Sequence, residues 1–160
     1  MREIVFAGGC FWGLEAYFKK YEGVEKTEVG YANGLIDNPV YDQVKKGGTG
    51  HAEVVHLVYN PEVISLKTLL EKFWQVIDPT VLNRQGPDIG HQYRTGIFYM
   101  NPDDLPEITA SLEKVKTQYE RPIMTEIEPL NCYYTAEEYH QDYLAKNPNG
   151  YCHIDLSLYD

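Results

Sequence analysis

Near the N-terminus, a strand pattern gives way to a helix pattern across Gly8-Gly9-Cys10-Phe11-Trp12-Gly13. Residues 3–7 form a short apolar run that is typical of a strand. Apolar side chains then recur at the three- and four-residue spacing of one helix face, at Phe11, Leu14, Phe18 and Tyr21. Gly23 stands where such a helix would end. The pattern therefore places Cys10 at a strand-to-helix turn, at or beside the helix N-terminus.

Cys10 has two interpretations at this position. Free backbone N–H groups and the helix dipole favour an anion there, so the thiol should ionise more easily than a free one. Gly8 and Gly9 would let the chain turn and let another molecule approach. The alternative is a small buried cysteine that only packs. The aromatic neighbours Phe11 and Trp12 favour a reactive thiol in a pocket.

Length and composition limit the classes of protein that fit. A chain of 160 residues with 43% hydrophobic and 24% charged residues predicts a single globular domain over residues 1–160. The net charge of −10 argues against a nucleic-acid binder, which needs a basic face. No apolar run has membrane-spanning length, and the N-terminus lacks the apolar core of a secretion signal. Three cysteines do not suggest a disulfide-built secreted scaffold, so a cytoplasmic monomer is expected.

The remaining patterns give the order βαββαβαβα. Strands are expected at residues 3–7, 24–31, 51–59, 93–99 and 123–127, and helices at residues 11–21, 65–77, 103–119 and 135–144. The last helix should open with a capping box at Thr135 and turn Tyr139, Tyr143 and Leu144 towards the core. Trp74 is expected in the core. This order predicts an α+β fold with helices packed on one mixed β-sheet.

Two irregular stretches should be either flexible or functional. Residues 37–50 are rich in glycine and poor in core-forming side chains. Residues 80–92 are polar and lead into a strand. Asp88 in this second stretch is either an ordinary turn residue or part of a site loop.

Glu53 begins an otherwise apolar strand face that continues through Val55, Leu57 and Tyr59. The simple interpretation is a carboxylate solvated at the rim of the sheet. The sharper one is a carboxyl group removed from water, whose raised pKa would keep it protonated near neutral pH.

Four kinds of chemistry fit these parts. The first is redox thiol chemistry, in which Cys10 attacks and a second cysteine resolves the product. The second is acyl transfer through a Cys–His pair, although none of the five histidines is singled out. A metal site lacks the usual ligand spacing. A non-catalytic module that binds through an aromatic pocket is the fourth, and the 14 tyrosines would suit such a pocket.

Short motifs along nearly the whole chain resemble those of one enzyme family. The matching segments are Gly9-Cys10-Phe11-Trp12-Gly13 with Glu15, Val29-Gly30-Tyr31, Asn38-Pro39-Val40-Tyr41, Gly48-Thr49-Gly50-His51-Ala52-Glu53-Val54, Phe73-Trp74, Asp78-Pro79-Thr80, Asn83-Arg84-Gln85-Gly86, Gln92-Tyr93-Arg94 and Ala136-Glu137 to His140-Gln141. Together, in this order, they resemble peptide methionine sulfoxide reductase A. The resemblance implies an α/β roll, a two-layer sandwich built on a mixed sheet.

The resemblance also implies a reaction. It makes the chain a reductase of the S epimer of methionine sulfoxide, free or in proteins, without a prosthetic cofactor. Cys10 would attack the sulfoxide sulfur, Glu53 would protonate the oxygen, and Cys152 would resolve the sulfenic acid as a disulfide that thioredoxin reduces. Roles around the substrate fall to further residues: Tyr41 and Tyr93 at the oxygen, Asp88 in the polar network, and Phe11 and Trp12 around the S-methyl group.

Four departures from the family pattern qualify these expectations. No cysteine follows Cys152, so a two-cysteine relay is expected, and Cys132 is expected to be structural. Pro87 and His91 replace residues that are commonly Asn and Thr in the family. Phe11 belongs to the predicted core stripe although the family places it in the pocket. The ending at residues 153–156 resembles the junction to a B-type reductase, which suggests one domain of a longer protein.

Overall fold

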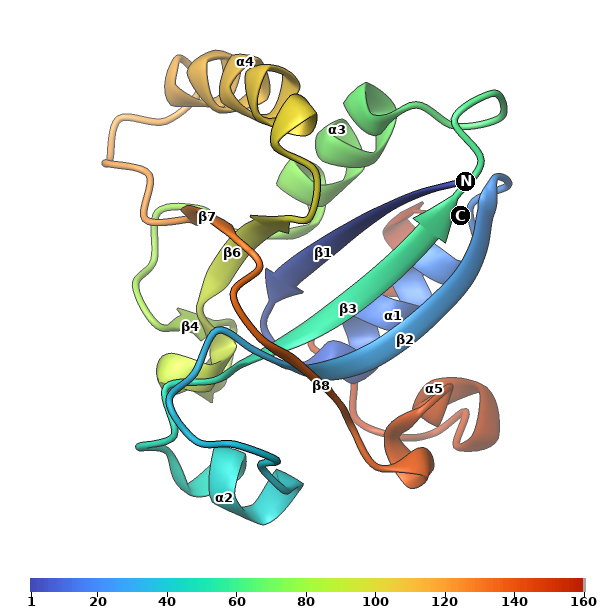
Figure 1. The fold of residues 1–160 in the computed structure, drawn as a ribbon, viewed down its shortest axis with the longest axis vertical. Helices are drawn as coiled ribbons and strands as arrows, with labels where there is room; N and C mark the ends of the chain where they lie inside the picture. The colour runs from blue at the N-terminus through green and yellow to red at the C-terminus, as the bar shows by residue number, and fades with distance from the viewer. Residues whose placement is uncertain (160) are drawn as a thin grey trace.

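The computed structural model describes residues 1–159, and its centre is a six-stranded sheet (Figure 1). The strand order is β7-β6-β1-β3-β2-β8. Only the β6–β7 pair is parallel, and the other neighbouring pairs are antiparallel. The strands span Arg2–Gly8 (β1), Val24–Ala32 (β2), Ala52–Tyr59 (β3), Thr95–Tyr99 (β6), Glu126–Pro129 (β7) and Tyr133–Thr135 (β8). The predicted α+β fold on a mixed sheet is confirmed.

The helices cover one face of this sheet. In Figure 1, α1 (Phe11–Lys19) lies behind β2 and β3, while the segment between β7 and β8 crosses the opposite face. Alternation along the strands divides the core accordingly. On β1, Ile4 and Phe6 join the large cluster beneath the helices, and Val5 and Ala7 join a smaller cluster under the crossing segment. The molecule is therefore a two-layer sandwich with a thin cover on its second face.

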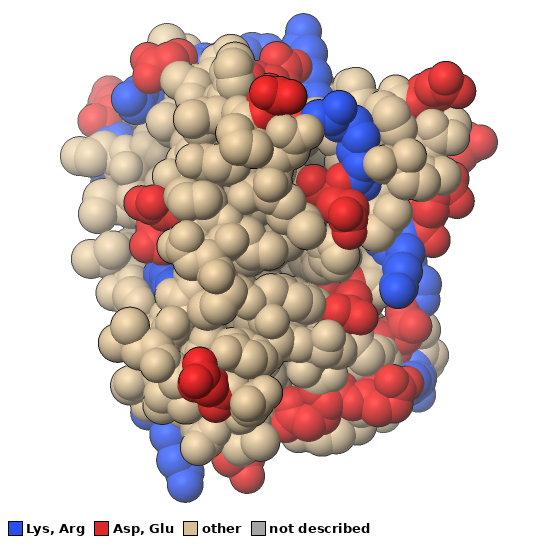
Figure 2. Space-filling model, viewed as in Figure 1, with Lys and Arg blue, Asp and Glu red and all other residues tan. Residues whose placement is uncertain are grey.

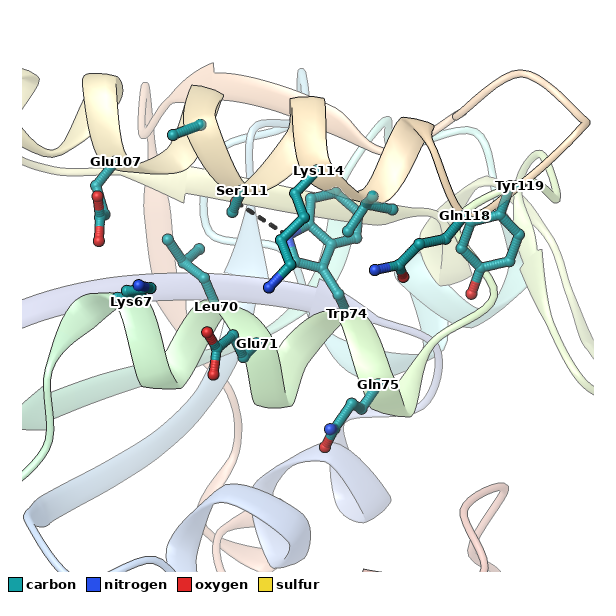
Figure 3. A pocket seen from close by; sticks show the side chains of 12 residues that line it. Lys67, Leu70, Glu71, Trp74, Gln75, Glu107, Ser111, Lys114, Gln118 and Tyr119 are labelled. Carbon is teal, nitrogen blue, oxygen red and sulfur yellow. Dashed lines mark hydrogen bonds between the residues drawn. The ribbon is translucent and has the colours of Figure 1, made fainter.

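Two longer helices, α3 (Leu66–Val76) and α4 (Leu105–Lys116), pack against each other, and α3 stacks Phe73 on Phe6 of β1 at 4.7 Å between ring centroids. Ser65 caps α3, because its hydroxyl accepts a hydrogen bond from the Thr68 N–H at 3.1 Å. The Trp74 indole is buried as expected and donates to the Ser111 hydroxyl across the helix pair at 3.0 Å (Figure 3). A groove of about 710 Å³ runs between these helices, and none of the predicted site residues lines it.

Several short elements were not predicted. Residues 37–50 contain the helix α2 (Tyr41–Lys46), which buries Val44, and residues 80–92 contain a hairpin of β4 (Arg84–Gln85) and β5 (Asp88–Ile89). The strand expected at residues 123–127 begins later, as β7, and β8 was missed. These elements have two to six residues, too few to show a hydrophobic period.

The helix predicted at residues 135–144 is wrong. Thr135 ends β8, and its hydroxyl donates a hydrogen bond to the Glu28 carboxylate instead of capping a helix. A 3₁₀ turn at Glu138–His140 follows, and Asp142 at φ +51° interrupts the chain before α5 (Tyr143–Lys146). Tyr139 is 56% exposed rather than in the core. Contacts to β2 and α1 thus outweigh the local capping signal.

The remaining 3₁₀ turns are at His91–Tyr93, Pro102–Asp104 and Leu156–Tyr159. Charge on the face opposite the helices is mixed but mainly acidic (Figure 2). Among residues 1–159, no helix is long and apolar enough to cross a membrane.

Candidate active site

Cys10 occupies the N-cap position of α1, directly after β1, as the sequence predicts. Gly9 makes the turn with φ +81°, where a Cβ would lie 2.8 Å from Gln85 Cβ. The Cys10 residue is 7% exposed. The next residue, Phe11, donates its backbone N–H to Glu53 Oε1 at 3.1 Å. The start of α1 therefore joins the thiol to a carboxyl group from β3.

Glu53 is buried rather than solvated at the rim, with 1% of its surface exposed. The other carboxyl oxygen, Oε2, is buried and has no hydrogen-bond partner among residues 1–159. Burial raises the pKa of Glu53 to about 8, against the lowering effect of the Phe11 N–H, and the negative charge of Asp88 raises it further. Glu53 is thus a carboxylic acid that stays largely protonated near pH 7.

The prediction that Cys10 ionises easily is wrong for the substrate-free protein. Burial, followed by the negative charge of Glu53, raises the pKa of the Cys10 thiol well above its ordinary value. The backbone N–H groups of Trp12 and Gly13 act in the expected downward direction, but their effect is smaller. A helix N-terminus favours a thiolate only when the site is open enough to solvate it or holds a compensating charge.

Tyr41 and Tyr93 lie within the electrostatic reach of the same two groups. Burial raises the pKa of each phenol, and the negative charges of Glu53 and Cys10 add to the shift. Both hydroxyls are therefore neutral donors at physiological pH. Asp88, on β5, accepts a hydrogen bond from the Tyr151 hydroxyl at 2.8 Å. The five predicted polar residues of the first step thus act on one another electrostatically.

Phe11 and Trp12 form an aromatic wall beside the thiol. Phe11 is fully buried, and its ring lies 5.8 Å from Tyr31 and 6.5 Å from Tyr41 between centroids, so it serves both core and pocket. Trp12 is half-buried, and its ring centroid is 6.5 Å from that of Tyr41. This wall offers apolar surface to one side of a ligand.

Three residues that support this wall were not assigned roles from the sequence. Tyr143 stacks on Trp12 at 3.7 Å between ring centroids. His140 Nδ1 accepts the Trp12 indole N–H at 2.9 Å. Glu137 accepts the Tyr41 backbone N–H at 2.9 Å and the Tyr31 hydroxyl at 2.8 Å. The motif from Ala136 to Gln141 contains Glu137 and His140 but not Tyr143, and no local pattern shows which partners these side chains reach.

Cys152 lies over the first turn of α1. A Cβ at Gly13 would come within 2.9 Å of Cys152 Sγ, so the absence of a side chain there admits the thiol. The Cys152 S–H donates to the Ile154 carbonyl oxygen at 3.1 Å, and burial raises its pKa. Cys132 instead contacts the Gly34 carbonyl, 3.7 Å away, beside the β2–β8 pair. The three thiols are free in this structure.

Replacing Glu53 with Gln should stabilise the folded protein. The pKa of Glu53 is near 8 in the folded protein and has its ordinary, lower value in the unfolded chain. As pH rises between these two values, the unfolded state releases the proton first, so the folded protein loses stability. Gln retains an oxygen for the Phe11 N–H. We expect the free energy of unfolding of Glu53→Gln to exceed that of the wild type by about 3 kcal/mol at pH 7 and by little at pH 4. Urea titrations at both pH values measure this, and an equal difference at both would contradict the raised pKa.

A thiol at a helix N-terminus beside a neutral carboxylic acid and an aromatic wall defines an enzyme of nucleophilic thiol chemistry. Within residues 1–159, no group of three or more His, Cys, Asp or Glu side chains is arranged to hold a metal ion. Which reaction such an enzyme catalyses depends on which substrate binds against the aromatic wall.

Comparison with known proteins identifies the family. The family model described as peptide methionine sulfoxide reductase matches residues 2–159. The peptide methionine sulfoxide reductase MsrA of Clostridium tetani is 55% identical over 156 residues, which cover 98% of this chain and 95% of the relative. The chain belongs to the peptide methionine sulfoxide reductase family and is an oxidoreductase that acts on methionine sulfoxide.

Solved structures agree with this assignment. Reduced Mxr1 from Saccharomyces cerevisiae matches with a TM-score of 0.89 and 44% identity, covering 94% of this chain and 88% of Mxr1. The same yeast protein in complex with Trx2 matches with a TM-score of 0.63 and 30% identity, covering 89% and 84%.

Proposed function

We propose that Cys10 and Glu53 carry out the oxygen transfer together. Cys10 Sγ attacks the sulfoxide sulfur while the Glu53 carboxyl group gives its proton to the sulfoxide oxygen. The attack forms an S–S bond to the substrate sulfur. The protonated oxygen then moves to Cys10 Sγ as its bond to the substrate sulfur and the new S–S bond both break, so methionine leaves and Cys10 becomes a sulfenic acid. The proton lost by the Cys10 thiol restores Glu53. The observation that carries this proposal is the buried Glu53, whose neighbour Phe11 follows Cys10 directly.

The raised thiol pKa fits this sequence of events. With Glu53 neutral, the larger of the two negative charges that oppose a thiolate is absent and only that of Asp88 remains, while the N–H groups of Trp12 and Gly13 favour the thiolate. A sulfoxide that takes a proton at oxygen carries positive charge on sulfur, which attracts electrons from Cys10 Sγ. We propose that the thiol loses its proton only as substrate binds, which would limit oxidation of the empty enzyme.

We propose that the aromatic wall and the two phenols bind different parts of the substrate. Phe11 and Trp12 would hold the S-methyl group, and the neutral hydroxyls of Tyr41 and Tyr93 would donate to the oxygen. Asp88, which acts electrostatically on Tyr93, accepts a hydrogen bond from the Tyr151 hydroxyl. A site that holds methyl on one side and oxygen on the other would select one configuration at sulfur, and we propose the S epimer because the family resemblance implies it.

We propose that Cys152 resolves the sulfenic acid and that thioredoxin reduces the resulting Cys10–Cys152 disulfide. The contact of Cys152 Sγ with the Gly13 position, on the first turn after Cys10, supports the first part. The complex of the related Mxr1 with Trx2 supports the second. Residues 1–160 would act as a single reductase domain and as a monomer, in a reducing compartment such as the cytoplasm.

Cys152→Ser tests the relay. This variant should produce one methionine per enzyme molecule at the wild-type rate and then stop when thioredoxin is the reductant, since no thiol can release the sulfenic acid as a disulfide. Multiple-turnover rates should fall by more than about a hundredfold. Cys132→Ser is the matched control and should turn over normally. Sustained turnover by Cys152→Ser with thioredoxin, lost only when Cys132 is also replaced, would assign the resolving role to Cys132.

A further inference from the structure

His153 is a buried titratable side chain that the oxygen transfer does not use. It follows Cys152 directly and packs against the turn between β1 and α1. Cβ atoms at Gly9 and Gly13 would lie 2.8 Å and 3.1 Å from its ring nitrogens, so both glycines are needed for the ring to sit there. The imidazole is therefore held against the backbone that carries Cys10.

One hydrogen bond fixes the tautomer of this ring. His153 Nε2 lies 2.9 Å from the Gly8 carbonyl oxygen, which can only accept, so Nε2 carries the proton. The other nitrogen, Nδ1, then presents a lone pair. Nδ1 is buried and has no hydrogen-bond partner among the residues that the structure describes. A buried acceptor without a donor is costly, which suggests that it serves a step in the reaction.

The Cys152 thiol is a donor that lies close to His153 Nδ1. Cys152 Sγ and His153 Nδ1 border the same point, because a Cβ at Gly13 would lie 2.9 Å from the first and 3.1 Å from the second. In the reduced protein the thiol proton instead points to the Ile154 carbonyl oxygen at 3.1 Å. A rotation of the Cys152 side chain would redirect that proton from the carbonyl to the lone pair.

We propose that His153 Nδ1 is the general base that takes the proton of Cys152 when this thiol attacks the Cys10 sulfenic acid. This inference rests on the relay proposed above. The Cys152 S–H bond breaks, the S–S bond to Cys10 forms, and the S–O bond of the sulfenic acid breaks. The proton held on Nδ1 then passes to the departing hydroxide, which leaves as water. Cys152 is oxidised, Cys10 is reduced, and His153 ends neutral.

The surroundings suit a neutral base. Burial lowers the pKa of His153 below its ordinary value, although the Gly8 carbonyl and the negative charge of Asp88 act in the opposite direction. The groups around it are that carbonyl from β1, Asp88 from β5 and the Cys152 thiol beside α1. Near pH 7 the ring is therefore unprotonated, and Asp88 stabilises the imidazolium as it forms. The thiol needs this help because burial raises its own pKa.

His153→Gln tests the proposal. Its amide N–H can replace Nε2 at the Gly8 carbonyl, while the basic nitrogen is lost. A single turnover on methionine sulfoxide, followed by acid quench, alkylation of free thiols and mass spectrometry, measures methionine and the disulfide separately. We expect methionine to form at the wild-type rate and the disulfide about a hundredfold more slowly at pH 7. Cys10 sulfenic acid should accumulate and react with a 1,3-diketone trap.

The pH profile distinguishes a base from a structural role. The deficit of His153→Gln should shrink as pH rises towards 10, because hydroxide then ionises Cys152 without help. His56→Gln is the matched control, since His56 pairs with Glu3 at 2.8 Å on the sheet, and should match the wild type. A disulfide rate within twofold of wild type at pH 7, or a constant deficit at every pH, would overturn the assignment.

A measurement on the wild-type protein tests the role of His153 even if the variant does not fold. With a histidine base, the rate of disulfide formation should be nearly independent of pH from about 7 to 8.5. A tenfold rise per pH unit across this range would mean that the thiol ionises unaided and would contradict the role of His153. Methionine production without any Cys10–Cys152 disulfide would instead disprove the relay itself.

Discussion

Cys10→Ser should abolish reduction of methionine sulfoxide. A serine oxygen that accepted the sulfoxide oxygen would have to form an O–O bond, whereas sulfur forms a stable S–O bond. The structure offers no substitute on α1, since Cys10 is its N-cap and the next residues are Phe11 and Trp12. We expect a loss of more than about 10⁴-fold in single-turnover methionine formation.

The control for this prediction is Cys132→Ser, which removes a thiol that contacts only the Gly34 carbonyl among the hydrogen bonds described. Its single-turnover yield should equal that of the wild type. Any methionine formed by folded Cys10→Ser at a rate within a hundredfold of wild type would show that another group attacks the sulfoxide.

Glu53→Gln should slow oxygen transfer by about 10²- to 10⁴-fold while substrate affinity changes little. Gln keeps the size of the side chain and an acceptor for the Phe11 N–H, but it has no acidic proton for the oxygen. Rapid-quench measurement of methionine at saturating substrate gives the rate, and the substrate dependence gives the affinity. A loss in affinity with an unchanged rate would make Glu53 a binding group instead of an acid.

Glu15→Gln is a control for burying a carboxyl group. Glu15 is also about 1% exposed, but the Thr27 hydroxyl and the Asp142 N–H satisfy its two oxygens at 2.7 and 2.8 Å. Its rate of oxygen transfer should stay within a few-fold of wild type. In the wild type, the rate should fall as pH rises through about 8, because Glu53 then loses its proton. The Glu53→Gln variant should lack this fall.

The long elements and the sheet class could be predicted because their side chains repeat. The 3.6-residue stripes of α1, α3 and α4 and the alternation along β3 are local patterns that the fold preserves. Alternation also placed Glu53 on an apolar strand face, although it left open whether the carboxyl group is buried or solvated at the rim. The helix expected at residues 135–144 failed because Glu137 and Gln141 bond to β2 and its neighbours, which no local rule describes.

The sequence indicated which residues belong to the candidate site, but it did not give their pKa shifts or the contacts that support them. The N-terminal position of Cys10 was correct, but the direction of its pKa depends on burial and on Glu53, which lies 43 positions away in the sequence. The support of Trp12 by His140 and Tyr143 depends on the same kind of distant contact. His153 was not singled out, because its two glycine neighbours and the Gly8 carbonyl come together only in the fold.

The central claim is that one thiol accepts the sulfoxide oxygen and a second resolves it. The most direct test is a single turnover without reductant on each epimer of methionine sulfoxide, followed by intact mass and mapping of the disulfide. We predict that only the S epimer is consumed and that the protein loses two hydrogen atoms through a Cys10–Cys152 bond. Consumption of neither epimer by folded protein with a free Cys10 thiol would contradict the account.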